Sequence, residues 1–165
     1  MFVDIVRTIG ICATYVLLRF FVPRFFNLAR DITIDARAFR SALIITITCI
    51  VGYALGAYVP DPWWADRARH VVGGGLAVTL ACFLALRESA PRLGVLRFAV
   101  VAAFLVSTLG LANECSEFLL GITDSNYTFD PYGDTEWDLV SNAAGLIIGI
   151  CMLAPFARKD SVRSS

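Results

Sequence analysis

The chain has 165 residues, of which 58% are hydrophobic and 17% are charged, and its mean hydropathy is +0.70. A soluble domain of this size would carry more charge and shorter apolar runs, so the composition indicates an integral membrane protein. The formal net charge of zero argues against a nucleic-acid partner. The length suits one membrane domain over residues 1–165 and leaves no room for a second.

Five apolar segments are each close to the ~20 residues that cross a bilayer as a helix. The first, residues 3–22, contains Arg7 and Arg19. It therefore either spans the membrane with both side chains reaching the surface, or lies on the membrane as an amphipathic helix. The other four segments are residues 43–59, 65–86, 95–120 and 137–156. Because lipid cannot satisfy free backbone groups, we expect an all-α transmembrane bundle with about five spans.

Basic residues gather in the first and third connections and after the last segment. They include Arg24, Arg30, Arg37, Arg40, Arg87, Arg92, Arg97, Arg158, Lys159 and Arg163, whereas residues 121–138 contain no Lys or Arg. By the positive-inside rule, these basic regions are cytoplasmic. Five spans then place the N-terminus outside and the C-terminus in the cytoplasm.

Polar residues lie near the outer ends of three apolar segments. They are Asp66 with His70, Glu114 with Glu117, and Asp134 with Asp138 and Asn142. Spacings of three and four place the members of each group on one face of a helix. At ~1.5 Å per residue, each group lies within one or two turns of the outer boundary. We therefore predict that three helices bring these side chains together at one depth.

Several carboxylates this close cannot all stay ionised in a low dielectric, so either some gain protons or a cation joins them. Carboxylates with an imidazole match the ligands of a divalent cation, either Mg²⁺ or Mn²⁺, or Zn²⁺ where the histidine takes part. The predicted metal ligands are His70, Glu114, Glu117 and Asp138. Alternatively, Glu114 or Glu117 is catalytic and acts as a general acid or base.

Two further interpretations need no ligand. Arg67 or Arg69, on the same turn as His70, could neutralise the carboxylates internally. The polar side chains could also bind one another and hold three helices together, as polar groups do in membrane bundles. The sequence leaves these alternatives open.

Glycines indicate where helices approach closely. Residues 73–75 are three consecutive glycines, which also permit a local bend, and Gly145 with Gly149 forms a GxxxG face. These faces could contact neighbours within the bundle, a second copy or a membrane-protein partner. Membrane lipids are the expected surroundings.

The connection at residues 121–137 either forms a lid over the polar residues or is a solvated loop. Asp124, Asn126, Thr128 and Asp130 alternate as in a calcium loop. However, Phe129 and Thr135 stand where such a loop needs glycine and glutamate. A calcium loop is therefore disfavoured.

Three motifs in chain order resemble those of VanZ-like membrane proteins. Residues 66–70 (DRARH) are similar to a D-K-x-x-H opening, residues 114–118 (ECSEF) to an E-x-x-Q/E segment, and residues 138–149 to a D-x-x-x-N-x-x-G-x-x-x-G ending. Residues 133–138 (GDTEWD) are closer to the D-T-x-W-D of the related YjdF-type inner-membrane proteins. The resemblance covers about residues 61–152, so the helix at 3–22 is an addition. It implies a small multi-pass protein of the bacterial cytoplasmic membrane, with its polar motifs near one face.

Three functional hypotheses follow. The first is a cell-envelope protein whose outer polar pocket binds a cation, or through it the headgroup of an envelope lipid or cell-wall precursor. The second is a membrane enzyme that uses a carboxylate as general base on a lipid-linked substrate. The third is a non-catalytic subunit of a larger membrane complex.

Overall fold

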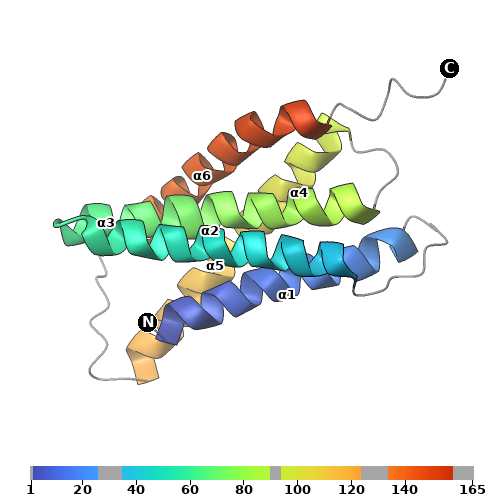
Figure 1. The fold of residues 1–165 in the computed structure, drawn as a ribbon. Coiled ribbons are helices and arrows are strands. Elements are labelled where there is room, and N and C mark those ends of the chain that lie inside the picture. Colours follow the sequence, from blue (N-terminus) through green and yellow to red (C-terminus); the bar gives the residue numbers. More distant parts are fainter. Residues whose placement is uncertain (1, 26–34, 90–93, 124–133, 158–165) are drawn as a thin grey trace, which may run out of the picture.

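The computed structural model describes residues 2–25, 35–89, 94–123 and 134–157, and nearly all of them are helical. The separate helices are α1 (Phe2–Phe25), α2 (Ala36–Tyr58), α5 (Val95–Thr123) and α6 (Asp134–Ala157). Between α2 and α5, one continuous helix is formed by α3 (Pro62–Arg69), the π-helical segment η1 (His70–Leu76) and α4 (Ala77–Ser89). Figure 1 shows these helices running lengthwise beside one another. The all-α prediction is confirmed for the described residues.

Four helices in this part of the chain are long and apolar enough to cross a membrane. They are Ala36–Tyr58, Pro62–Glu88, Val95–Leu119 and Asp134–Ala157. These helices contain the four apolar segments predicted after residue 42. Only residue 59, the last of segment 43–59, and residue 120, the last of segment 95–120, lie beyond them. Helix α1 is not among the four, so its crossing of the membrane, the count of five spans and the orientation of the termini stay predictions.

Aspartate caps set where two of these helices begin. The Asp35 carboxylate accepts the Ala38 N–H at 2.9 Å at the start of α2, and this hydrogen bond holds the pKa of that carboxyl below its usual range. Asp61 accepts the N–H groups of Trp63 and Trp64 at the start of α3. Such caps satisfy amide groups that have no partner within the helix.

The continuous helix α3–η1–α4 lies at the centre of the bundle. Its most apolar part is 56% buried, against 22% or 28% for the other three long helices. Small residues on α4 (Ala77, Ala81 and Ala85) are buried, which lets α1, α5 and α6 approach it closely. This central position brings the polar residues of α3 and η1 into contact with α6.

The predicted close approach at the glycines is confirmed, and it lies within the bundle. A Cβ atom at Gly145 on α6 would lie 2.0 Å from the Val71 carbonyl oxygen and 2.8 Å from the Gly75 Cα atom. A Cβ atom at Gly149 would meet Thr79 at 2.8 Å. The GxxxG face of α6 therefore packs against η1 and α4.

The glycine run also coincides with a change in helix type. The Ala77 N–H bonds to the Val72 carbonyl, five residues earlier, as in a π-helix. Such short π segments within α-helices often occur at functional sites. Of the connection at residues 121–137, residues 121–123 end α5 and residues 134–137 begin α6, while residues 124–133, on which the lid-or-loop alternative and the disfavoured calcium loop depend, lie outside the described residues.

Candidate functional site

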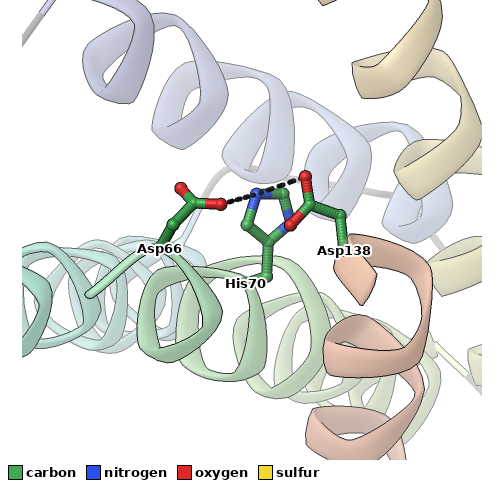
Figure 2. Close-up of side chains that lie close together, drawn as sticks. All are labelled: Asp66, His70 and Asp138. Carbon is green, nitrogen blue, oxygen red and sulfur yellow. Dashed lines mark ion pairs between the residues drawn. The ribbon is translucent and has the colours of Figure 1, made fainter. Parts of the chain in front are cut away.

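The His70 imidazole lies between two carboxylates that come from different helices. Its Nε2 atom is 3.7 Å from Asp66 Oδ2 on α3 and 3.4 Å from Asp138 Oδ2 on α6. Figure 2 shows the imidazole between the two carboxylates. Asp66 and His70 are four residues apart on one face of the continuous helix, as the spacing predicts. Both His70 and Asp138 are buried, and the Asp138 side chain is only 1% exposed.

Arg67 is the buried cation of this site. One of its terminal nitrogens, Nη1, lies 2.8 Å from Asp138 Oδ1, and the other, Nη2, donates to Asp66 Oδ2 at 2.8 Å. Nη2 also pairs with the carboxylate of Asp134, whose backbone oxygen accepts a hydrogen bond from Nη1 at 3.2 Å. One guanidinium group therefore connects α3 to two carboxylates of α6.

The two glutamates of α5 complete the group. Asn113 donates through Nδ2 to Glu114 at 3.2 Å and to Glu117 at 2.9 Å. The Arg7 guanidinium of α1 pairs with Glu117, and its Nε donates to Asn113 Oδ1 at 2.7 Å. Glu114 is buried and forms no ion pair with a described residue.

We call these side chains the acidic cluster. Its members are Asp66, His70, Glu114, Glu117, Asp134 and Asp138, with Arg7 and Arg67 as its cations. Two sets of three could each hold a metal ion, since one ligand atom per residue lies within 4.8 Å of the others. They are Asp66 with His70 and Asp138, and Glu114 with Glu117 and Asp138. Asp138 belongs to both sets.

The last predicted polar residue, Asn142, lies one turn further along α6, packed against glycines of two other helices. A Cβ atom at Gly74 would lie 1.9 Å from Asn142 Oδ1, and one at Gly110 would lie 3.0 Å from its Nδ2. The buried Oδ1 atom accepts no hydrogen bond from a described residue. The Asn142 side chain therefore occupies space that exists because residues 74 and 110 are glycines. Its Oδ1 atom has no hydrogen-bond donor among the described residues.

Sequence reasoning missed two members of this arrangement. The sequence predicts Arg7 at the membrane surface, yet it pairs with Glu117, 110 residues away. Asn113 was not singled out, although it precedes Glu114 and donates to both glutamates. The internal neutralisation considered for Arg67 matches its contacts. Arg69 instead points to α2, where its Cζ atom lies 5.8 Å from the centre of the Tyr53 ring.

A second polar group at the opposite end of the bundle was also missed. The Tyr15 hydroxyl of α1 donates to Glu88 at 2.8 Å and accepts from Arg19 at 3.1 Å. Ser41 of α2 also donates to Glu88, and Arg19 forms ion pairs with Glu88 and with Asp35. These contacts join α1, α2 and α4 where α2 begins and α4 ends.

A cavity of about 580 Å³ adjoins the acidic cluster. Its wall is mostly apolar and is formed by α1, α2, α5, the α3–η1–α4 helix and Asn142 of α6. His70 and Arg7 belong to both the wall and the cluster. The volume lies within the ~300–1,000 Å³ that is common for small-molecule pockets.

Comparison with known proteins gives one family match. Residues 5–159 match the model of a family described as predicted membrane protein (DUF2238). No curated protein and no solved structure matches the chain.

Proposed function

The chain belongs to the DUF2238 family of predicted membrane proteins, and we propose that this integral membrane protein binds a divalent cation in its acidic cluster. The observation that carries the proposal is the pair of three-residue ligand sets that share Asp138. Family membership itself assigns no ligand, so the argument rests on charge and geometry.

The charge balance of the acidic cluster favours a cation. Its carboxylates outnumber its guanidinium groups by three, because Arg7 and Arg67 face five acidic side chains. Burial makes an uncompensated carboxylate costly, so such groups either take up protons or bind cations. A divalent ion beside Asp138 would offset most of this excess.

The two ligand sets suit different ions. Glu114, Glu117 and Asp138 supply only oxygen atoms, as Mg²⁺ and Mn²⁺ prefer, whereas the other set adds the His70 imidazole, which admits Zn²⁺. Arg67 contacts both carboxylates of the histidine set, whereas the glutamate set keeps one carboxylate, Glu114, without a guanidinium partner among the described residues. We therefore assign the cation to the glutamate set, with Mn²⁺ or Mg²⁺ as the ion and Asp138 as the shared ligand.

The outward-facing location of this site in a bacterial cytoplasmic membrane is also part of the proposal. The acidic cluster lies where α3 and α6 begin, at the end of the bundle opposite Arg87 and Arg97. The concentration of basic residues at that other end supports a cytoplasmic position for it. The acidic cluster would then lie beneath the outer leaflet.

The test is cation binding by the purified protein in detergent, with Mn²⁺ as the probe. Wild type should bind about one Mn²⁺ ion per chain, detected by electron paramagnetic resonance. Glu114→Gln/Glu117→Gln should weaken binding at least ~10-fold, since losing even a supporting partner of a metal site has that effect. Glu136→Gln is the matched control, because this exposed glutamate of α6 lies outside the cluster.

The size-exclusion profile of each variant reports whether it is folded. If wild type and the double variant bind Mn²⁺ equally, the proposal is wrong. If neither binds Mn²⁺ and the double variant only loses stability, the polar groups serve to hold the helices together. If His70→Asn but not the double variant abolishes binding of Zn²⁺, the ion belongs to the histidine set instead.

A general-base role is the second candidate function. It is favoured by Glu114, which is buried, has no guanidinium partner among the described residues and accepts one long hydrogen bond from Asn113. Such a carboxylate could accept a proton from a lipid-linked substrate. Turnover lost in Glu114→Gln with Mn²⁺ binding intact would select this role.

Co-purification of a stoichiometric protein partner would instead favour a subunit of a larger complex.

A further inference from the structure

We infer that the cavity beside the acidic cluster holds one acyl chain of a membrane phospholipid, with the lipid phosphate bound by Arg69. This inference goes beyond the cation proposal and does not depend on it, because none of the assigned cation ligands, Glu114, Glu117 and Asp138, lines the cavity. Four features support it: the opening of the cavity, the polarity along its wall, the environment of Arg69 and the unsatisfied Asn142.

The cavity borders the surface that the bilayer would cover. Ile5 and Ile9 of α1 and Ile50 of α2 line it and are at least half exposed on the outside of the bundle. In a membrane protein such exposed aliphatic side chains face lipid. A lipid chain could therefore enter from the bilayer without crossing water.

The wall changes from polar to apolar along the helix axis. Near the acidic cluster it carries Arg69, His70 and Asn113, whereas further along it carries Val78 and Leu109. Val78 follows His70 by eight residues on the same continuous helix, so the wall extends roughly 12 Å between them. This gradient matches an amphiphile with its head at the cluster end and its chain deeper in the membrane.

Arg69 is a cation with no carboxylate partner among the residues that the structure describes. A Cβ atom at Gly56 of α2 would lie 2.6 Å from Arg69 Cγ, so the glycine leaves room for this side chain. Arg69 forms no ion pair with a described residue, and its buried Nε has no hydrogen-bond partner there. It contacts the face of Tyr53, which also lines the cavity. An arginine without an ion-pair partner among the described residues suits a phosphate, because phosphate oxygens accept hydrogen bonds from two nitrogens of one guanidinium group.

Asn142 also has a side-chain oxygen without a hydrogen-bond partner among the described residues. Its side chain is part of the cavity wall, the residue is 3% exposed, and Oδ1 accepts no hydrogen bond from a described residue. A buried oxygen of this kind is uncommon, because leaving it unpaired is costly. The glycerol or headgroup of a lipid could supply the missing donor.

The experiment measures how much phospholipid stays with the purified protein after washing in a delipidating detergent. Native mass spectrometry should find about one phospholipid per wild-type chain. Gly73→Leu should fill the cavity and lower the amount of retained phospholipid at least ~10-fold. Gly73 lines the cavity, and a Cβ atom there meets nothing within 4 Å. Gly94→Leu is the matched control, since Gly94 also has open space but lies outside the cavity.

The head of the lipid is tested with a second pair of variants. Arg69→Gln should lower phospholipid retention. Arg97→Gln is the control, and it should leave retention unchanged because Arg97 is an exposed residue of α5. Retention of a fatty acid in place of a phospholipid would overturn the assignment of phosphate to Arg69. Equal retention by wild type and Gly73→Leu would overturn the cavity as the binding site.

The two proposals can fail separately. Glu114→Gln/Glu117→Gln should lose Mn²⁺ and keep the phospholipid, while Gly73→Leu should keep Mn²⁺ and lose the phospholipid. If the double glutamate variant is folded but loses the phospholipid, the two sites are not independent.

Discussion

The Arg67 guanidinium contacts Asp66 on its own helix and Asp134 and Asp138 on α6. Its side chain is 6% exposed and that of Asp138 is 1% exposed, so this ion pair is shielded from water. Removing one partner of a buried ion pair leaves an uncompensated charge, which costs more than the pair itself contributes. The stability of the α3–α6 contact should therefore depend on Arg67.

Arg67→Met should lower the free energy of unfolding by about 3–5 kcal/mol. Denaturant titration in detergent micelles, followed by circular dichroism, measures this change. Arg97→Met is the control, and as an exposed substitution it should stay within about 0.5 kcal/mol of wild type. Adding Asp138→Asn to Arg67→Met should recover part of the loss, because the unpaired charge is then gone. A loss no larger than that of Arg97→Met would contradict the role assigned to Arg67.

At the scale of elements, η1 and α6 pack with their backbones almost in contact. Val71 and Gly75 of η1 face Gly145 of α6, and no side chain of any size fits between them. The closeness positions Asp138, two turns before Gly145, against His70 and Arg67. Widening this contact should therefore disturb the acidic cluster as well as the packing.

Gly145→Ala should lower the free energy of unfolding by about 1–3 kcal/mol, as overpacking of a tight contact does. Its added methyl group would lie 2.0 Å from a backbone oxygen, which cannot move aside as a flexible side chain can. Gly73→Ala is the control within η1 and should cause no loss, since its methyl group meets nothing within 4 Å. Equal stability of the two variants, measured by the same denaturant titration, would contradict the tight contact.

Helical spacing was enough to predict most of the cluster. The three- and four-residue intervals placed each polar pair on one face, and the distance between His70 and Asp66 agrees with that reasoning, whereas the approach of Asp138 to His70 followed from their predicted common depth. Partners from distant elements could not be predicted in this way. Arg7 meets Glu117 only because of how α1 packs, and adjacent residues such as Arg69 and His70 point ~100° apart around the helix. The cavity likewise arises from packing and has no signature in the sequence.

At the scale of the whole molecule, α1 is tied to both ends of the bundle. Arg7 pairs with Glu117 of α5 at the end of the acidic cluster, and Arg19 pairs with Glu88 of α4 at the other end. The two arginines are separated by roughly 18 Å along the helix, which is more than half of the ~30 Å hydrocarbon thickness. Charged residues inside membranes are usually paired in this way. We therefore expect α1 to cross the membrane as a fifth span.

A short epitope tag at each end of the chain tests this expectation. With five spans, an N-terminal tag should be digested by protease added outside intact spheroplasts, and a C-terminal tag should be protected. If α1 lies on the membrane instead, both tags should be protected, because the four remaining spans return the chain to the same side. A tag exposed at the C-terminus would contradict the proposed orientation. Digestion of both tags after lysis is the control for accessibility.

The pairing of Arg7 with Glu117 also constrains how the protein is assembled. Helix α1 is synthesised before α5, and the carboxylate that compensates its arginine follows 110 residues later. Until α5 is made, α1 holds an unpaired charge that is costly to keep in hydrocarbon. Helix α1, although it precedes the other described helices in the chain, is therefore expected to be among the last to reach its final position.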